Sequence, residues 1–182
     1  MDHSSDNHIM MQVKAGDIDK LGILFERYKD KIFRYFYHST GSRVDSEDLV
    51  QTVFFRILKY REHFSGYGKF TSWMYHIARN AKVDLYRKNK NHSRNEDILP
   101  DMVESQTSTE KAVLENEQNK LLETAFKQLG EEQKEILILS KYQELKYKQI
   151  AEILDCSEGN VKIKVYRALK ELKQIYNKLE ES

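Results

Sequence analysis

The 182-residue chain contains a single proline, Pro100, which lies in the one long stretch where helical periodicity fails. Proline interrupts helices because its nitrogen has no hydrogen to donate and its ring clashes with the preceding turn. The rest of the chain is rich in Leu, Ile, Glu, Lys and Gln, which favour helices, and only seven glycines interrupt it. The sequence therefore predicts an all-α fold with two small helical domains joined by a flexible linker around Pro100.

The expected first domain covers residues 1–90. Its apolar residues recur at the spacing of amphipathic helices. These are expected at residues 20–37, from 45 or 46 to a stop before Ser65, and at 71–88, with a short piece at 9–13. A loop at residues 38–43 is expected to end the first long helix. The second is expected to start at Asp45 or Ser46, because an acidic first turn suits the helix dipole.

The expected linker covers residues 91–110, where polar and charged residues dominate. Charge changes sign through this region, from basic Lys90 and Arg94 to the acidic stretch between Glu96 and Glu104. The second domain is expected at residues 111–182 and contains about four helices. These begin with Thr109 as an N-cap and Gly130 as the first C-cap, and continue over residues 131–145, 148–154 and 157–179.

Composition narrows the function classes. The chain has 30 Lys and Arg against 29 Asp and Glu, so any contact with nucleic acid depends on local charge. One cysteine, Cys156, excludes an internal disulfide framework, and no long apolar run is present, so we expect a cytoplasmic protein without membrane insertion. Six histidines are scattered, and no zinc, Walker, dinucleotide or nucleophile-elbow motif occurs. We expect no enzyme activity, metal, cofactor or small-molecule substrate.

Residues 147–169 form the sharpest local pattern. A short apolar segment ends in a tight turn, and Ser157 then caps a helix whose inward face is expected to be Val161, Val165 and Leu169. This pattern is typical of a helix-turn-helix, whose second helix enters the DNA major groove. The segment from Lys141 to Lys178 contains nine basic and five acidic residues, which gives it a local net charge of +4. A helical hairpin with a solvated basic face remains the alternative.

The first domain carries a second pattern, in which four aromatic residues and Lys69 lie interleaved between Phe64 and Trp73 and a basic helix follows. Aromatic faces beside cations suit unstacked bases of single-stranded nucleic acid. Taken alone, residues such as Phe70 and Trp73 are more often core residues than platforms for bases.

Both halves resemble one family. Residues 45–54 and 70–80 are similar to region 2 of the extracytoplasmic-function (ECF) subfamily of sigma-70-type bacterial RNA polymerase sigma factors, and residues 122–172 look like region 4. The resemblance implies a factor that binds core RNA polymerase and directs promoter-specific initiation. It also implies that the acidic linker passes through the polymerase channel, and that an anti-sigma factor holds the protein inactive.

The resemblance also implies residue roles. In the family, the helix that holds Asp48, Gln51, Thr52 and Phe55 grips the clamp helices of the polymerase, although Thr52 stands where an acidic residue is common. The segment from Phe64 to Phe70 captures a flipped base of the −10 element, and the helix after it tracks the melted strand. The residues implied for the −10 element are Phe64, Tyr67, Lys69, Phe70, Trp73, Arg79, Asn80, Lys82 and Arg87. Those implied for the −35 element are Asn160, Lys162, Ile163, Lys164, Tyr166 and Arg167.

Two other functions remain open. A helix-turn-helix regulator that acts without being a polymerase subunit would explain residues 147–173, but it leaves the patterns at 45–54 and 64–80 unexplained. A helical interaction protein that sequesters a partner would have no affinity for DNA.

Overall fold

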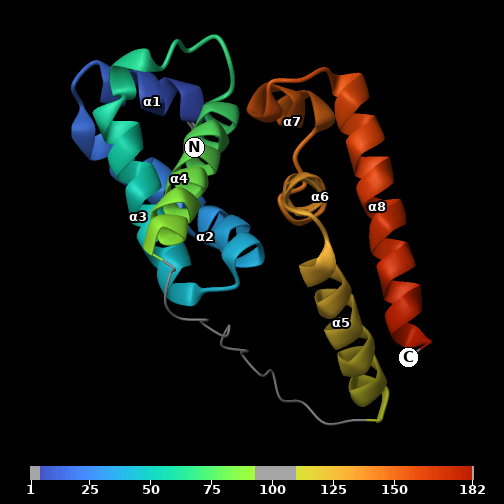
Figure 1. Cartoon of the computed structure of the whole chain (residues 1–182). Coiled ribbons are helices and arrows are strands. Elements are labelled where there is room, and N and C mark those ends of the chain that lie inside the picture. The colour runs from blue at the N-terminus through green and yellow to red at the C-terminus, as the bar shows by residue number, and fades with distance from the viewer. Residues whose placement is uncertain (1–4, 93–109, 182) are drawn as a thin grey trace. The chain divides into compact units, whose positions relative to one another are not determined.

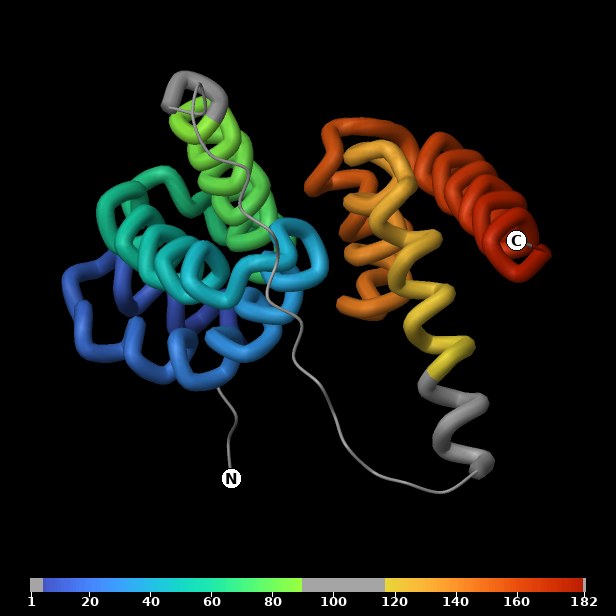
Figure 2. The backbone as a smooth tube through the Cα atoms, turned by 60° about the horizontal axis from the view of Figure 1, so that its bottom comes forward, coloured from blue at the N-terminus to red at the C-terminus, as the bar shows by residue number. Residues whose placement is uncertain are grey.

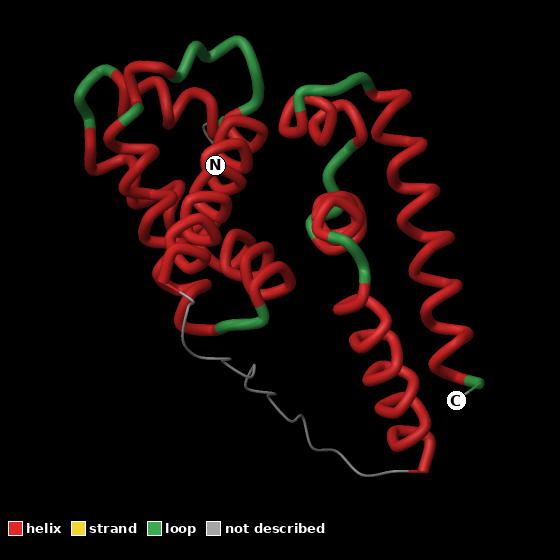
Figure 3. The backbone as a smooth tube through the Cα atoms, viewed as in Figure 1, coloured by secondary structure: helices red, strands yellow, loops and turns green. Residues whose placement is uncertain are grey.

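The computed structural model describes residues 5–92 and 110–181. All regular elements in these two segments are helices, as Figure 3 shows. The chain divides into two compact units, the first containing α1 to α4 and the second α5 to α8 (Figure 1). The all-α, two-domain prediction is confirmed. Most of the predicted linker, with Pro100, and the predicted cap Thr109 lie outside the described residues.

The first unit consists of four helices and two short 3-10 turns. Its elements are α1 (Asp6–Lys14), η1 (Ile18–Lys20), α2 (Leu21–Thr40), α3 (Arg43–Lys59), η2 (Arg61–His63) and α4 (Phe70–His92). In Figures 1 and 2, α2 and α3 lie side by side. Buried side chains from all four helices form one core, which includes Met10, Leu24, Ile32, Tyr35, Phe36, Val53, Ile57, Met74 and Ala78. The predicted N-terminal piece at 9–13 is thus part of α1, and Ile9 and Val13 are also buried.

The boundary between α2 and α3 differs from the prediction. α2 continues to Thr40, and Gly41 ends it with φ of 70°, its N–H donating to the Tyr37 carbonyl. Ser42, rather than Asp45 or Ser46, is the N-cap of α3, because its hydroxyl accepts the Asp45 N–H at 3.2 Å. Ser46 is buried instead, and its hydroxyl donates to the Ser42 carbonyl at 2.6 Å. The predicted loop at 38–43 therefore shrinks to a two-residue turn.

The second unit consists of α5 (Glu110–Gln128), α6 (Glu131–Leu137), a π-helical turn labelled η3 (Ile138–Tyr142), α7 (Tyr147–Leu154) and α8 (Glu158–Glu180). Both α5 and α6 pack against α8. The buried apolar side chains include Phe126, Leu129, Ile136, Leu139, Ile150, Val161 and Val165. Within the described residues no helix is both long and apolar enough to cross a membrane.

Two predictions for the second unit were wrong. Gly130 is not a left-handed C-cap, because its φ is −64° and it occupies the N-cap position of α6. Its carbonyl accepts the Lys134 N–H at 2.9 Å. The predicted helix 131–145 is α-helical only to Leu137. The π turn follows, in which the Gln143 N–H donates to the Ile138 carbonyl at 2.9 Å, and Glu144 then turns the chain with φ of 51°.

Candidate polymerase and promoter interfaces

The outward face of α3 carries the residues implied to bind polymerase. Asp48, Gln51 and Phe55 are exposed, and Phe55 has 65% of its surface open to solvent. Thr52 is half-buried, and its hydroxyl donates to the Asp48 carbonyl at 2.9 Å. Val44, which the sequence reasoning missed, is 69% exposed and continues the same stripe, because positions 44, 48, 51 and 55 repeat at helical spacing. Exposed apolar side chains beside a carboxylate and an amide suit a protein partner.

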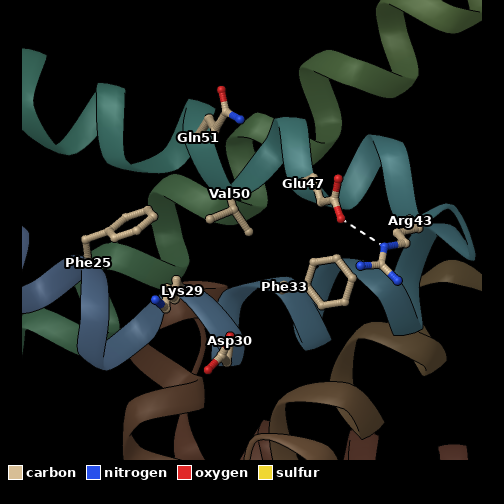
Figure 4. Close-up of a pocket in the computed structure, with 8 residues that line it drawn as sticks. All are labelled: Phe25, Lys29, Asp30, Phe33, Arg43, Glu47, Val50 and Gln51. Carbon is tan, nitrogen blue, oxygen red and sulfur yellow. Dashed lines mark hydrogen bonds and ion pairs between the residues drawn. The ribbon is translucent and has the colours of Figure 1, made fainter.

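A groove of about 430 Å³ runs between α2 and α3 beside this face. Figure 4 shows Phe25, Phe33 and Val50 around it, with an ion pair between Arg43 and Glu47 of 2.9 Å at its edge. Gln51 lines the groove as well as the exposed face, so the two surfaces are continuous. The remaining lining residues are Lys29 and Asp30. A hydrogen bond to the Glu26 carboxylate raises the pKa of Lys29.

The loop between η2 and α4 separates its aromatic residues into two groups. Phe64 and Phe70 are buried, with ring centroids 6.3 Å apart, and Trp73 is half-buried with its ring 5.2 Å from that of Phe64. Neither buried ring offers a face to a base in this structure. Tyr67 at the tip is fully exposed, and Lys69 is exposed beside it. The buried pair thus anchors the loop, while Tyr67 is the aromatic side chain that it presents.

The basic residues predicted on α4 do not share one face. Asn80 and Arg87 are both exposed and lie seven positions apart, so they occupy the same side of the helix. Arg79 is half-buried. Lys82 is buried on the opposite side, with its ammonium 5.8 Å from the centre of the Tyr35 ring. An ion pair between Arg56 and Asp84 of 2.9 Å joins α3 to α4.

α7 and α8 form the predicted helix-turn-helix. Ser157 caps α8 by accepting the Asn160 N–H at 3.2 Å, as the sequence predicts. Asp155 adopts φ of 51° in the turn, and the N–H of half-buried Cys156 donates to the Ala151 carbonyl at 3.0 Å. This bond closes the end of α7 and sets the direction in which α8 begins.

The exposed face of α8 carries all six residues implied to read the −35 element. Asn160, Ile163 and Arg167 follow one another at helical spacing, and Tyr166 beside them is 68% exposed. Lys162 and Lys164 flank this strip, and the Lys164 ammonium lies 3.3 Å from the Glu132 carboxylate. The predicted inward face needs one correction: Ala168 is buried with Val161 and Val165, whereas Leu169 is 39% exposed at the edge of the packed face.

Two α1 residues that sequence reasoning missed contact the Tyr67 loop. The amide nitrogen of Asn7 donates to the Gly66 and Gly68 carbonyls at 3.2 and 2.6 Å, and the Lys14 ammonium donates to the Phe64 carbonyl at 2.8 Å. These contacts join residues 50 or more positions apart, so no local sequence signal could have revealed them.

α1 is fixed to α2 at the same end. Asp6 pairs with Arg27 at 2.7 Å and accepts the hydrogen bond of the Tyr28 hydroxyl. Burial, together with this hydrogen bond, raises the pKa of Tyr28 above its usual range. Among the described residues, no group of three or more His, Cys, Asp or Glu side chains is placed to hold a metal ion.

Comparison with known protein families assigns each unit separately. The family model for Sigma-70 region 2 matches residues 24–92, and that for Sigma-70 region 4 matches residues 119–172. The chain is 31% identical to the ECF RNA polymerase sigma factor BldN of Streptomyces coelicolor, over 94% of this chain and 67% of that protein. It is 28% identical to the ECF RNA polymerase sigma factor SigW of Bacillus subtilis, over 90% and 92% of the two chains.

Solved structures share the fold. CnrH, in complex with the cytosolic domain of CnrY, matches with a TM-score of 0.69 at 20% identity over 94% of this chain and 97% of that one. The sigma factor RpoE of Bartonella quintana, in complex with the anti-sigma factor NepR, matches with a TM-score of 0.68 at 20% identity over 88% and 97%. Three observations point to the same family: the order of the two matched regions, the helix-turn-helix and the named relatives. This chain belongs to the extracytoplasmic-function sigma factors of the sigma-70 family.

Proposed function

We propose that this sigma factor contacts core polymerase through α3, the −10 element through the Tyr67 loop and α4, and the −35 element through α8. The observation that carries the proposal is that all three surfaces are exposed on one chain. The region 2 match disfavours a regulator that acts without polymerase, because such a regulator needs only the helix-turn-helix. The proposed boundaries are residues 1–90 for region 2, 91–110 for the linker and 111–182 for region 4. We also propose that the acidic linker passes through the polymerase channel.

The proposed polymerase contact uses Asp48, Gln51, Thr52 and Phe55 against the clamp helices. Its support is the exposed stripe on α3, where Asp48 and Gln51 precede the aromatic ring of Phe55, which is 65% exposed. Burying this ring against a partner removes apolar surface from water, while the carboxylate and amide supply orientation.

The proposed −10 contact uses the loop tip and the outward side of α4. Tyr67 supplies a stacking face for an extruded base, and Lys69 supplies a cation beside it. Asn80 and Arg87 are placed along the same exposed side of α4, where they would follow the melted strand. Arg79 joins this contact from its half-buried position, whereas Phe64, Phe70, Trp73 and Lys82 shape the loop and the helix from within.

The proposed −35 contact inserts the N-terminal half of α8 into the major groove. Arg167 and Lys162 carry donors that suit guanine edges, and Asn160 suits adenine. Ile163, which is 49% exposed, offers an apolar contact that suits a thymine methyl group. Tyr166 and Lys164 complete the exposed face. A bidentate arginine contact discriminates between bases by roughly 1–3 kcal/mol.

Further partners follow from the relatives. The solved relative RpoE is bound to an anti-sigma factor, and we propose that a protein of that class holds this chain inactive. We further propose that the chain acts in the cytoplasm, where polymerase works, and that the polymerase supplies all of the catalysis.

Run-off transcription with core polymerase tests the function. Transcripts that depend on the chain are expected on promoter templates, and a stable complex with duplex DNA that needs no polymerase would contradict the proposal. An Asp48→Ala, Gln51→Ala double variant should lose core binding in a pull-down. Arg167→Ala should keep core binding and lose its preference for the −35 sequence. Asp19→Ala is the matched control, because that carboxylate is exposed outside all three surfaces.

A further inference from the structure

The loop that presents Tyr67 is held at both ends by one face of α1. Lys14 binds the Phe64 carbonyl where the loop begins, and Asn7 binds the Gly66 and Gly68 carbonyls on either side of the tip. Positions 7 and 14 share a helix face with Met11. The Met11 sulfur lies 3.2 Å from where a Cβ on Gly66 would sit, so the loop packs closely on this face. In Figure 1 the loop passes beside α1 before it enters α4.

Asn7 also caps α4. The first N–H groups of a helix lack partners within the helix, and the residue before Phe70 is Lys69, whose side chain has no acceptor. The side-chain oxygen of Asn7 accepts the Phe70 N–H at 2.8 Å, from 63 residues away in sequence. One amide therefore fixes both the path of the loop and the start of the helix that follows it.

The helix that supplies these hydrogen bonds, α1, is itself held firmly in the first unit. Ile9, Met10 and Val13 bury the other side of α1 in the core of the first unit. Asp6, one residue before Asn7, is paired with Arg27 at 2.7 Å and hydrogen-bonded to Tyr28. The loop itself contains Gly66, with φ of 78°, and Gly68, and glycine gives the backbone wide conformational freedom. The bonds from α1 restrict this freedom.

We propose that Asn7 is a positioning residue for reading of the −10 element: it holds the Tyr67 loop in the conformation that selects one base over the others. Asn7 precedes the residues matched by the region 2 family model, which begin at residue 24, so that match does not assign it. The inference rests on the proposed role of the loop. It predicts that loss of the Asn7 hydrogen bonds weakens base selection rather than polymerase binding.

The test compares wild-type, Asn7→Ala and Asn7→Asp proteins in run-off transcription with core polymerase. The templates carry a randomised −10 element and a barcode, so that sequencing the transcripts measures the preference for each base. A general loss of folded protein lowers all templates alike and leaves the preference unchanged. Loss of the Asn7 hydrogen bonds changes the preference for one base over the others. His8→Ala is the matched control, because that side chain is exposed on the same helix.

We expect the preference at the captured position to fall roughly five- to thirtyfold in Asn7→Ala, the effect of losing one to two net hydrogen bonds. Asn7→Asp keeps the acceptor for Phe70 but sets a carboxylate against two carbonyls. It should therefore lose base preference while the Phe70 N–H stays protected from hydrogen exchange. Wild-type preference in both variants would overturn the inference alone. Absence of transcripts with the wild-type protein would overturn the proposed function as well.

Discussion

Replacing Tyr67 with alanine isolates the contribution of one aromatic ring to promoter opening. The side chain is fully exposed, so its removal creates no cavity, and the free energy of unfolding should change by less than about 0.5 kcal/mol. A stacked base is worth roughly 1–3 kcal/mol by alanine substitution. Each 1.36 kcal/mol corresponds to a factor of about ten in rate or affinity. The amount of open complex formed should therefore fall about 5- to 150-fold.

The assay is permanganate footprinting of unpaired thymines at the −10 element, with the sigma factor bound to core polymerase. Tyr67→Phe is the matched control, because it keeps the ring and should stay within about twofold of wild type. Phe64→Ala provides the contrast: that ring is buried, so its loss should cost about 3–5 kcal/mol of stability and remove function through unfolding. Wild-type opening by a folded Tyr67→Ala protein would refute base stacking at the loop tip.

Three further predictions concern stability. Glu144→Gly should raise the free energy of unfolding of the second unit by about 0.5–1 kcal/mol, because Glu144 has φ of 51°; a lower thermal midpoint would contradict this. Ser157→Ala should cost about 1 kcal/mol by removing the cap of α8, whereas Ser157→Gly should cost only a few tenths, as measured by urea unfolding. Burial and the bond to Asp6 raise the pKa of Tyr28, so the folded state resists its ionisation while the unfolded state ionises near pH 10. Stability should therefore fall as the pH rises above 10, less steeply in Tyr28→Phe, and equal slopes for the two proteins would refute the assignment.

The parts of the fold that depend on local periodicity were predictable. The cap at Ser157 and the buried Val161 and Val165 follow from short-range pattern, because a helix repeats every three to four residues. Helix ends were less certain. Glycine is accepted both as a left-handed cap, as at Gly41, and in the extended backbone found at Gly130, and nearby residues do not distinguish the two.

The candidate site was predictable only in part, because burial depends on contacts that are distant in sequence. Aromatic residues placed close to a lysine do not show that Phe64 and Phe70 point inward while Tyr67 points outward. Lys82 looks like its basic neighbours on α4 until the packing places it beside Tyr35. Asn7 is the extreme case, since its partners begin 59 residues later in the chain.

The ion pair between Lys164 and Glu132 has a consequence for the ionic-strength dependence of DNA binding. A lysine that meets a phosphate normally displaces a condensed counterion from the DNA, which contributes about 0.9 to the slope of log affinity against log salt. The Lys164 ammonium already pairs with the Glu132 carboxylate at 3.3 Å. When Lys164 engages a phosphate, Glu132 stays close to the DNA as a partly compensating negative charge. Lys164 should therefore contribute less than a full phosphate contact to the salt slope of region 4.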